Sequence, residues 1–207
     1  MSEAQPPRVE VRRLWPADKE EFRDHLLRLD ERSRHWRFGG GMSDDFLIHY
    51  AERCFGEGDL LYGAFVDGRL CGAAELRSNR AIWSEQAPFD RHIKAEAAFS
   101  VEGAHRRQGI GEKLFKRILR AATNHGVETI EIVCMPDNVA MQRLAQKYKT
   151  RFTFEENSMT GRLTARRPTP MSLLREAAAD AIDFGESLFD AQWRAFAGEP
   201  QKKGDAA

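Results

Sequence analysis

The sequence has no excess of either charge, few cysteines and no long apolar run. Basic and acidic residues number 32 each, so the 207-residue chain has no formal net charge. This balance argues against long-range attraction to nucleic acid or to an anionic membrane. No apolar stretch approaches the roughly 20 residues of a transmembrane helix, and the polar start of the sequence does not resemble a signal peptide. We therefore expect a cytoplasmic protein that acts neither on membranes nor on nucleic acid.

Cysteine and histidine are too sparse to build a metal site or a disulfide framework. Cys54, Cys71 and Cys134 form no CxxC pair, and no two of the six histidines are spaced i, i+4. We expect buried, reduced thiols and no metal cofactor. Hydrophobic residues make up 42% of the chain, so one domain of this size can bury a core without such crosslinks.

Apolar periodicity predicts a mixed sheet flanked by helices. Strands are expected over residues 9–14, 60–66, 69–77, 95–101, 127–134, 151–155 and 160–165. Helices are expected to start near Pro16, Ser43, Ile110 and Asn138. Asp67-Gly68 predicts a tight hairpin. Hairpins combined with a strand–helix–strand crossover predict an α/β (α+β) fold, with a mainly antiparallel sheet of about six to seven strands.

The end of the chain has a different character. The proline-containing segment 166–170 predicts a boundary between a domain over 1–167 and a helical appendage over 168–198, with a disordered tail over 199–207. Gly185 is expected to divide or kink the appendage. Its apolar stripe is too continuous to stay in water, so we expect it to pack on its own domain or on a second subunit of a homodimer. The stripe comprises Leu174, Ala177, Ala178, Ala181, Leu188, Phe189 and Phe196.

The clearest chemical signature joins the strand at 95–101 to the helix that follows it. Gly109 and Gly111 stand at the helix start, where backbone NH groups can bind an anion. Six basic residues between positions 102 and 120 would gather positive charge there: Arg106, Arg107, Lys113, Lys116, Arg117 and Arg120. A tight turn followed by a solvated helix face would explain the same residues. The P-loop, the dinucleotide-binding GxGxxG motif and the nucleophile elbow GxSxG are all absent.

Arg106-x-x-Gly109-x-Gly111 after an apolar strand resembles the (Q/R)-x-x-G-x-(G/A) signature of the GCN5-related N-acetyltransferases (GNAT). The order of elements over residues 9–165 is similar to that fold, and Asn138 opens a helix where the family places an asparagine. Two segments are similar, more narrowly, to acetyltransferase domains that modify lysines of acyl-CoA synthetases. They are Ala95-Glu96-x-Ala-x-x-Val101 and Leu29-x-x-x-Ser33-x-x-x-Arg37-Phe38.

This resemblance implies acetyl-CoA, or another acyl-CoA, as the cosubstrate. The pyrophosphate would lie on the backbone amides of the glycine-containing loop, and the pantetheine would lie beside a strand that splays from its neighbour. The implied cofactor-binding residues are Phe99, Ser100, Val101, Arg106, Arg107, Gln108, Gly109, Ile110, Gly111, Asn138 and Met141. An acceptor amine, on a small molecule or on a protein lysine, would attack the thioester directly.

The resemblance leaves the proton transfers only partly assigned. Glu96 is the candidate general base, because a partly buried carboxylate in an apolar strand would have a raised pKa; alternatively, it points to solvent or pairs with an arginine. Asn138 is either a cofactor contact, a helix cap, or both. The family's usual tyrosine acid is replaced by Ala145, and Tyr148 is expected to be a packing residue. The missing tyrosine keeps an alternative open, an acyl-CoA-binding regulatory module with little turnover.

Overall fold

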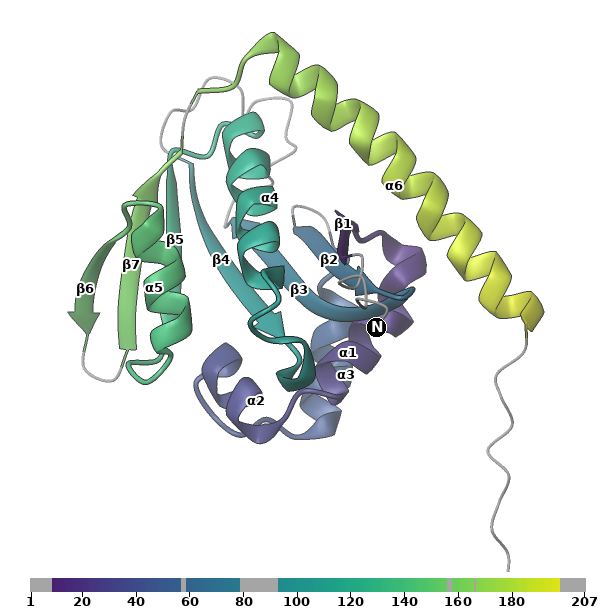
Figure 1. Cartoon of the computed structure of the whole chain (residues 1–207), viewed down its shortest axis with the longest axis horizontal. Helices are drawn as coiled ribbons and strands as arrows, with labels where there is room; N and C mark the ends of the chain where they lie inside the picture. Colours follow the sequence, from purple (N-terminus) through teal and green to yellow (C-terminus); the bar gives the residue numbers. More distant parts are fainter. Residues whose placement is uncertain (1–8, 57–58, 79–92, 156–157, 166, 198–207) are drawn as a thin grey trace, which may run out of the picture.

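The computed structural model describes residues 9–56, 59–78, 93–155, 158–165 and 167–197. Within this part of the chain, seven strands form one sheet in the order β1-β2-β3-β4-β5-β7-β6 (Figure 1). The strands are β1 Val9–Arg13, β2 Leu60–Val66, β3 Arg69–Ser78, β4 Lys94–Val101, β5 Thr129–Cys134, β6 Arg151–Glu155 and β7 Ser158–Thr164. The β4–β5 pair is parallel and the other neighbours are antiparallel. The predicted mixed, mainly antiparallel sheet is therefore confirmed.

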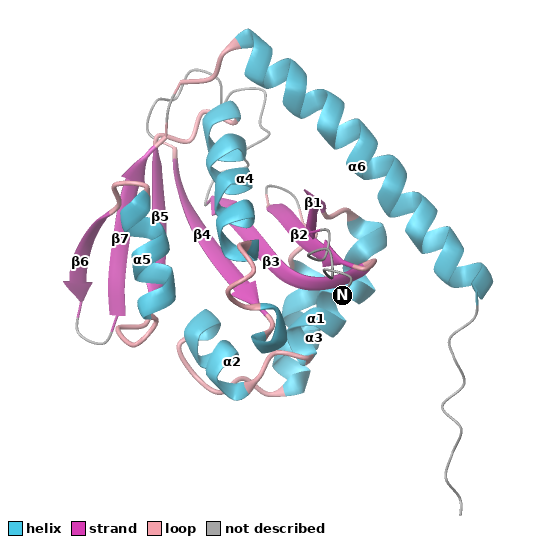
Figure 2. Ribbon diagram, viewed as in Figure 1, coloured by secondary structure: helices cyan, strands magenta, loops and turns pink. Residues whose placement is uncertain are grey.

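The helices lie on both faces of this sheet. They are α1 Lys19–Leu27, α2 Glu31–Phe38, α3 Asp44–Arg53, α4 Ile110–Asn124, α5 Val139–Lys147 and α6 Pro170–Ala197, with short 3-10 turns η1 Pro16–Asp18 and η3 Gly103–His105. Helices α4 and α5 cover one face, and α1 and α3 cover the other (Figure 2). All seven residues of β2 are buried, as expected for a strand covered on both sides.

Local sequence signals explain several element boundaries. Asp67 and Gly68 both have positive φ, 51° and 77°, which is the backbone that a two-residue hairpin between β2 and β3 needs. Ser43 caps α3, because its side-chain oxygen accepts a hydrogen bond from the Phe46 amide at 3.2 Å. Both features agree with the positions predicted from the sequence.

Helix α2 was not among the predicted helices; residues 32–38 are a cluster rich in arginine and aromatic side chains that ends before Gly39. Asp30 caps its start by accepting a hydrogen bond from the Ser33 amide at 2.7 Å. Gly39 ends it with a φ of 80°, the left-handed conformation common after helices. The segment has too few apolar residues to show a helical period, so its two cap residues, Asp30 and Gly39, are the sequence features that mark it as a helix.

The sheet opens between β4 and β5. Their ladder runs from Lys94–Thr129 to Glu96–Glu131, after which β4 continues to Val101 and β5 to Cys134. Figure 1 shows the two strands diverging from that point. The divergence places backbone of β4 beside a gap, which is the splay that the family resemblance implied.

Helix α6 runs unbroken from Pro170 to Ala197, so the predicted division at Gly185 is wrong. A Cβ atom added at Gly185 would meet open space, and no positive φ marks this residue. The predicted tail at 199–207 lies outside the described residues.

Candidate active site

A cavity of about 580 Å³ lies at the open end of the β4–β5 gap. Its walls come from the end of β4, the loop that leads into α4, the start of α5 and helix α2. Ten of the eleven residues that the sequence suggested for cofactor binding line it: Phe99, Ser100, Val101, Arg106, Arg107, Gly109, Ile110, Gly111, Asn138 and Met141. The exception is Gln108, which is exposed and donates from Nε2 to the Ala104 carbonyl oxygen at 3.2 Å.

The loop before α4 has the backbone geometry of an anion site. Gly109 is the N-cap of the 15-residue helix α4 and has a φ of 78°, while Arg107 has a φ of 62°. Positive φ values turn successive amides, and the first NH groups of a helix carry no intrahelical acceptor. Because Gly109, Ile110 and Gly111 line the cavity, the positive end of the helix dipole lies at its wall.

Helix α2 forms the facing wall, and it contacts the loop through Arg106. The Arg106 guanidinium donates to Ser33 Oγ and lies 3.5 Å from Asp30 Oδ2. The Trp36 ring has Arg32 and Arg106 over it, at 4.5 and 5.0 Å from the ring centroid. Arg32, Ser33 and Trp36 line the cavity and were missed as site residues, although the sequence showed their arginine and aromatic cluster.

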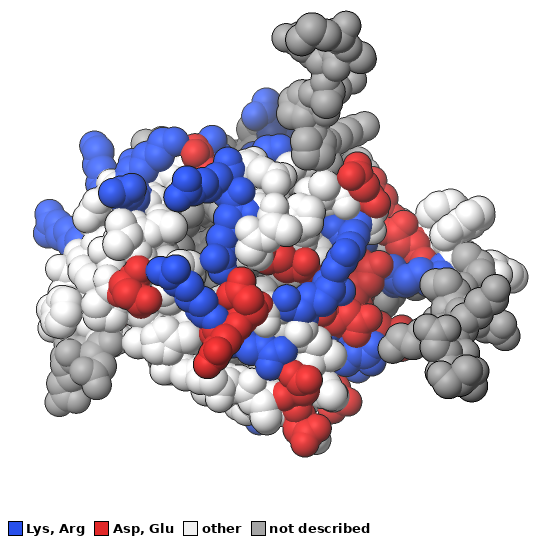
Figure 3. All heavy atoms as spheres, turned by 60° about the horizontal axis from the view of Figure 1, so that its bottom comes forward, with Lys and Arg blue, Asp and Glu red and all other residues white. Residues whose placement is uncertain are grey.

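The predicted basic patch is smaller than its residue count suggested. Arg117 is 8% exposed and pairs with Asp183 of α6 at 3.2 Å, so it does not contribute to the cavity wall. Lys116 pairs with Glu112 one helical turn away at 3.0 Å. Figure 3 shows acidic side chains between the basic ones on the face it presents. The positive charges lining the cavity are those of Arg32, Arg106 and Arg107.

Asn138 is a helix cap that also lies in the wall of the cavity. Its Oδ1 accepts a hydrogen bond from the Met141 amide at 3.1 Å, which caps α5, and the residue also lines the cavity. The preceding residue, Asp137, accepts a hydrogen bond at Oδ2 from the Trp36 indole at 2.8 Å. This contact connects α2 with the β5–α5 loop across the divergence of the strands.

A second cavity, of about 370 Å³, lies where the strands separate. Trp36 lines both cavities, and Glu96 lines this smaller one. Glu96 is exposed, whereas Ala95 and Ala97 beside it are 3% and 1% exposed. The expected partial burial of Glu96 is therefore wrong, because the alternation of β4 turns its apolar residues toward α4 and places Glu96 on the opposite face.

A buried carboxylate forms part of the wall of the smaller cavity. Glu75 is 2% exposed and accepts hydrogen bonds from Arg37 at 2.5 Å and from Tyr50 at 2.7 Å, and Arg77 Nη2 lies 3.2 Å away. Burial alone would raise the pKa of Glu75, but the two guanidinium groups outweigh it and hold this pKa below its usual value. Burial, together with the Glu75 charge, raises the pKa of Tyr50. The cluster is thus an ionised carboxylate with neutral and cationic donors, not a proton acceptor at neutral pH.

A second buried network lies beneath the larger cavity. His25 Nε2 is 2.9 Å from Ser100 Oγ, and His25 Nδ1 is 3.0 Å from Glu102 Oε1. Burial lowers the pKa of His25, and hydrogen bonds from His25 and Arg28 hold the pKa of Glu102 down despite its desolvation. A neutral imidazole that donates a hydrogen bond from Nδ1 to the Glu102 carboxylate and accepts one at Nε2 from the Ser100 hydroxyl satisfies both contacts. This network fixes α1 to the end of β4.

Tyr148 and Cys134 are two further residues near the site, and of these only Cys134 lines a cavity, the smaller one. Tyr148 stacks on Phe115 at 4.7 Å between ring centroids, and its hydroxyl lies 3.4 Å from Glu112 Oε1. It is not among the residues that line either cavity. Cys134 is 2% exposed, and burial raises the pKa of its thiol, which disfavours a nucleophilic thiolate.

Comparison with known proteins places this fold in a class. The GNAT domain of S. lividans PAT has a TM-score of 0.63 at 19% identity, over 75% of this chain and 90% of that domain. An N-acetyltransferase from Staphylococcus aureus Mu50 has a TM-score of 0.58 at 17% identity, over 77% and 99% of the two chains. The yncA protein of Salmonella typhimurium, solved with its cofactor acetyl-CoA, also scores 0.58 at 17% identity, over 78% and 96%. The fold is therefore the GNAT fold.

A family model described as the acetyltransferase (GNAT) family matches residues 14–149. The chain belongs to this family, and it is an N-acetyltransferase. The described part of the chain contains no helix long and apolar enough to cross a membrane. Nor do the described residues include a group of three or more His, Cys, Asp or Glu side chains that could hold a metal ion.

Proposed function

We propose that this protein transfers an acetyl group from acetyl-CoA to an amine where its two cavities meet. The larger cavity takes the cosubstrate, and the smaller one takes the acceptor. The single observation that carries this assignment is that Trp36 lines both cavities at the point where β4 and β5 separate. A thioester that reaches this point from one side can meet an amine that enters from the other.

The larger cavity suits a long anionic cosubstrate. The start of α4, with Gly109 as its N-cap, and the side chains of Arg32, Arg106 and Arg107 favour the pyrophosphate. Beyond Glu96, the side of β4 that faces the gap offers backbone groups to the amide-containing pantetheine arm, like a strand added to the sheet. Acetyl-CoA supplies the activated acyl group, and these residues orient it. A cytoplasmic location remains our prediction.

Glu96 is the group we propose as the acceptor of the amine proton. A lysine-type amine has a pKa near 10.4, so only a small fraction is neutral at pH 7 and a base increases the rate. Because Glu96 is exposed, it works as a solvent-accessible carboxylate in the wall of the smaller cavity. The leaving thiolate has a pKa near 8.5 and can depart without a strong acid, which fits the absence of a tyrosine at position 145.

The smaller cavity supports an acceptor amine carried on a flexible apolar arm. Trp36, Phe38 and Val133 contribute apolar wall, and Glu96 contributes an acidic mouth. A small amine and a lysine of a protein both meet this description. The buried Glu75 is balanced by Arg37 and Arg77, so it adds no net negative charge for a second cationic group.

The experiment that tests this proposal follows the release of free CoA over time from acetyl-CoA, with and without a panel of amines and lysine peptides. We expect release that depends on one class of amine. Tight acetyl-CoA binding without amine-dependent release would contradict turnover and favour the alternative, an acyl-CoA-binding regulatory module. The unfilled acid position at Ala145 is the observation that keeps this alternative in the test.

A further inference from the structure

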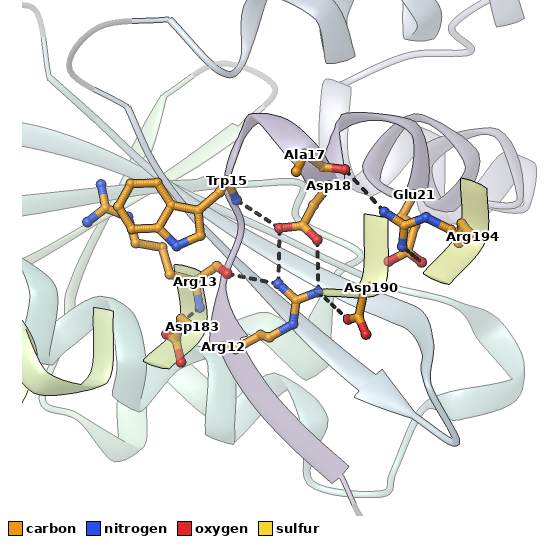
Figure 4. A network of polar contacts seen from close by, with 9 residues as sticks. All are labelled: Arg12, Arg13, Trp15, Ala17, Asp18, Glu21, Asp183, Asp190 and Arg194. Atoms are coloured by element: carbon orange, nitrogen blue, oxygen red, sulfur yellow. Dashed lines mark hydrogen bonds and ion pairs between the residues drawn. The ribbon is translucent and has the colours of Figure 1, made fainter. Parts of the chain in front are cut away.

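Helix α6 faces its own domain with polar side chains. It runs beside β1, the strand at one end of the sheet order (Figure 4). Asp183 accepts a hydrogen bond from the Arg13 backbone amide at 2.7 Å, Asp180 pairs with the Arg13 guanidinium at 2.6 Å, and Asp190 lies 3.1 Å from Arg12. A strand at the edge of a sheet has backbone NH groups that face no partner strand. Here Asp183 accepts a hydrogen bond from one of them, and other acidic side chains of α6 neutralise the arginines of β1. The inner face of α6 is acidic for this reason.

These contacts fix the rotation of α6 about its axis. Near its start, Glu176 is 4% exposed and accepts hydrogen bonds from Asn124 and from Tyr62, the latter at 3.3 Å. Near its end, Arg194 pairs with Glu21 at 2.5 Å and donates to the Ala17 carbonyl oxygen at 3.1 Å. Because partners hold the helix at both ends, it cannot turn its other side inward without breaking buried ion pairs.

The opposite side of α6 is apolar and exposed along its whole length. Nine of the thirteen large apolar side chains that are exposed in the described residues lie on this helix. At 100° per residue, the line opposite Glu176 and Asp183 passes through Met171, Leu174, Ala178, Ala181, Gly185, Phe189, Gln192 and Phe196. Leu174 and Phe189 are each 65% exposed, and Phe196 is 88% exposed. We call this line the outer stripe; it includes no charged residue.

The apolar area that α6 exposes can be compared with the area that each partner buries in a stable protein–protein interface. Three aromatic side chains lie on or beside the outer stripe, exposed by 65% at Phe189, 66% at Trp193 and 88% at Phe196. Taking about 150–250 Å² for each fully exposed side chain, these three leave roughly 400 Å² in water. Phe184 lies toward the other flank and packs edge-on against Trp15, at 5.2 Å between ring centroids. The aliphatic side chains add to this area, and a standard stable interface buries about 800 Å² per partner. A monomer rarely exposes one apolar patch of this size.

We propose that a second copy of this chain covers the outer stripe, with the two α6 helices packed against each other about a twofold axis. The stripe is self-complementary, because the small residues Ala178, Ala181 and Gly185 lie between Leu174 and Phe189. When two α6 helices pair about the middle of the stripe, small residues face small ones, so the two backbones can approach closely. Large residues then face large ones. A membrane surface fits less well, since helices that lie on membranes are flanked by Lys and Arg. Here the flanks carry a single basic residue, Arg175, beside the acid Glu186.

Sedimentation equilibrium of the full chain at micromolar concentration tests this proposal. We expect a dimer for the unchanged protein, and at least a tenfold rise in the dimer dissociation constant for Phe189→Glu and for Leu174→Glu. The matched control is Phe154→Glu, because Phe154 is also a phenylalanine that is 65% exposed, but on β6 at the far end of the sheet. This control should leave the dissociation constant unchanged. Far-UV circular dichroism should be alike for all four proteins, since each substituted side chain is exposed.

Three outcomes would overturn the proposal. A monomeric unchanged protein would do so, as would a dimer that both stripe variants leave intact, because the contact would then lie elsewhere. Sedimentation of a monomeric chain with vesicles of anionic lipid, lost on Phe189→Glu, would assign the stripe to a membrane surface instead. None of these readouts depends on acetyl transfer, so the proposal stands or falls separately from the proposed function.

Discussion

Trp36 and Asp137 join the two sides of the active site, with the indole Nε1 donating to the carboxylate Oδ2 at 2.8 Å. One residue lies on α2 and the other in the loop between β5 and α5, and they are 101 positions apart in the chain. The contact spans the divergence of β4 and β5. Trp36 thereby lies between the larger cavity, which we propose for the cosubstrate, and the smaller one, which we propose for the acceptor.

Replacing Trp36 by phenylalanine should weaken the alignment of the two cavities while keeping an aromatic ring. Phenylalanine lacks the Nε1 donor, so the bridge to Asp137 is lost at a cost of about 0.5–1.5 kcal/mol. We expect KM for acetyl-CoA to rise several-fold with a small change in Tm. Asp137→Asn is the control, since its side-chain oxygen can still accept the bond. If both variants lose activity equally, the hydrogen bond is not the cause.

Gly109→Ala should impair the anion site through the backbone. The φ of 78° at Gly109 costs an L-residue about 1–2 kcal/mol, and relief of that strain would turn the amides away from the cavity. Gly39→Ala is a matched control, because Gly39 has a φ of 80° and, like Gly109, has no atom within 4 Å of an added Cβ. We expect both variants to lose similar stability in urea. Calorimetric titration should show weaker acetyl-CoA binding for Gly109→Ala only.

Glu96→Gln should lower kcat/KM about 10²-fold without changing stability, because Glu96 is exposed and its proposed role is proton acceptance. Glu131→Gln is the control, since Glu131 is the β5 ladder partner of Glu96. It should retain nearly full activity. The measurement is a profile of kcat/KM from pH 6 to 9. An unchanged profile for Glu96→Gln would remove this residue from the mechanism.

Glu75→Gln should destabilise the fold strongly, by about 3–5 kcal/mol, because it leaves Arg37 and Arg77 near an uncharged group in a buried cluster. The folded-state pKa of Glu75 is depressed, so its stabilisation is present above the unfolded pKa, near 4.5, and is lost as pH falls through the folded value. Urea midpoints of the unchanged protein and the variant should therefore converge at acid pH. Glu112→Gln, which removes a carboxylate paired with surface lysines, should shift the midpoint much less. Equal shifts would contradict the special role of the buried cluster.

The protein should lose stability between about pH 6.5 and pH 4. Burial lowers the pKa of His125 to about 4, so the unfolded chain takes up its proton first as pH falls below the ordinary histidine value of 6.5. This difference amounts to about 3 kcal/mol. Burial lowers the pKa of His25 as well, which acts in the same direction.

The variant His125→Gln should show a shallower loss of stability between pH 7 and pH 5 when urea midpoints are compared. His49→Gln, at an exposed position, is its control and should follow the unchanged protein. A slope in His125→Gln as steep as that of the unchanged protein would mean that other groups cause the loss.

Features encoded by adjacent residues could be predicted, as the Asp67-Gly68 hairpin, the Ser43 cap and the start of α4 show. The Glu75 cluster could not be, because its partners come from α2, α3 and β3, and only the folded chain brings them together. The same holds for His25 and Ser100, which are 75 positions apart. The glycine-containing loop was recognisable because one short segment carries its chemistry.

Orientation was harder to predict than periodicity. In β4 the alternation is clear, but with helices on both faces of the sheet it does not say which face holds Glu96. In α6 the apolar stripe is equally clear, and apolar stripes usually face the core. Here Arg12, Arg13 and Arg117 line the surface that the helix meets, so the acidic side turns inward. The arginines of the facing surface therefore determine which side of α6 turns inward, and the sequence of the helix alone does not show this.

The contact between β1 and α6 also gives the chain an order of completion during synthesis. The Arg13 amide and Asp183 lie 170 positions apart, so β1 leaves the ribosome well before the helix that covers it. Until that helix emerges, the outer edge of β1 and its arginines are open to other chains, and such edges promote aggregation. We expect ribosome-bound chains that stop at residue 167 to need chaperones, and chains that include α6 to be released from them.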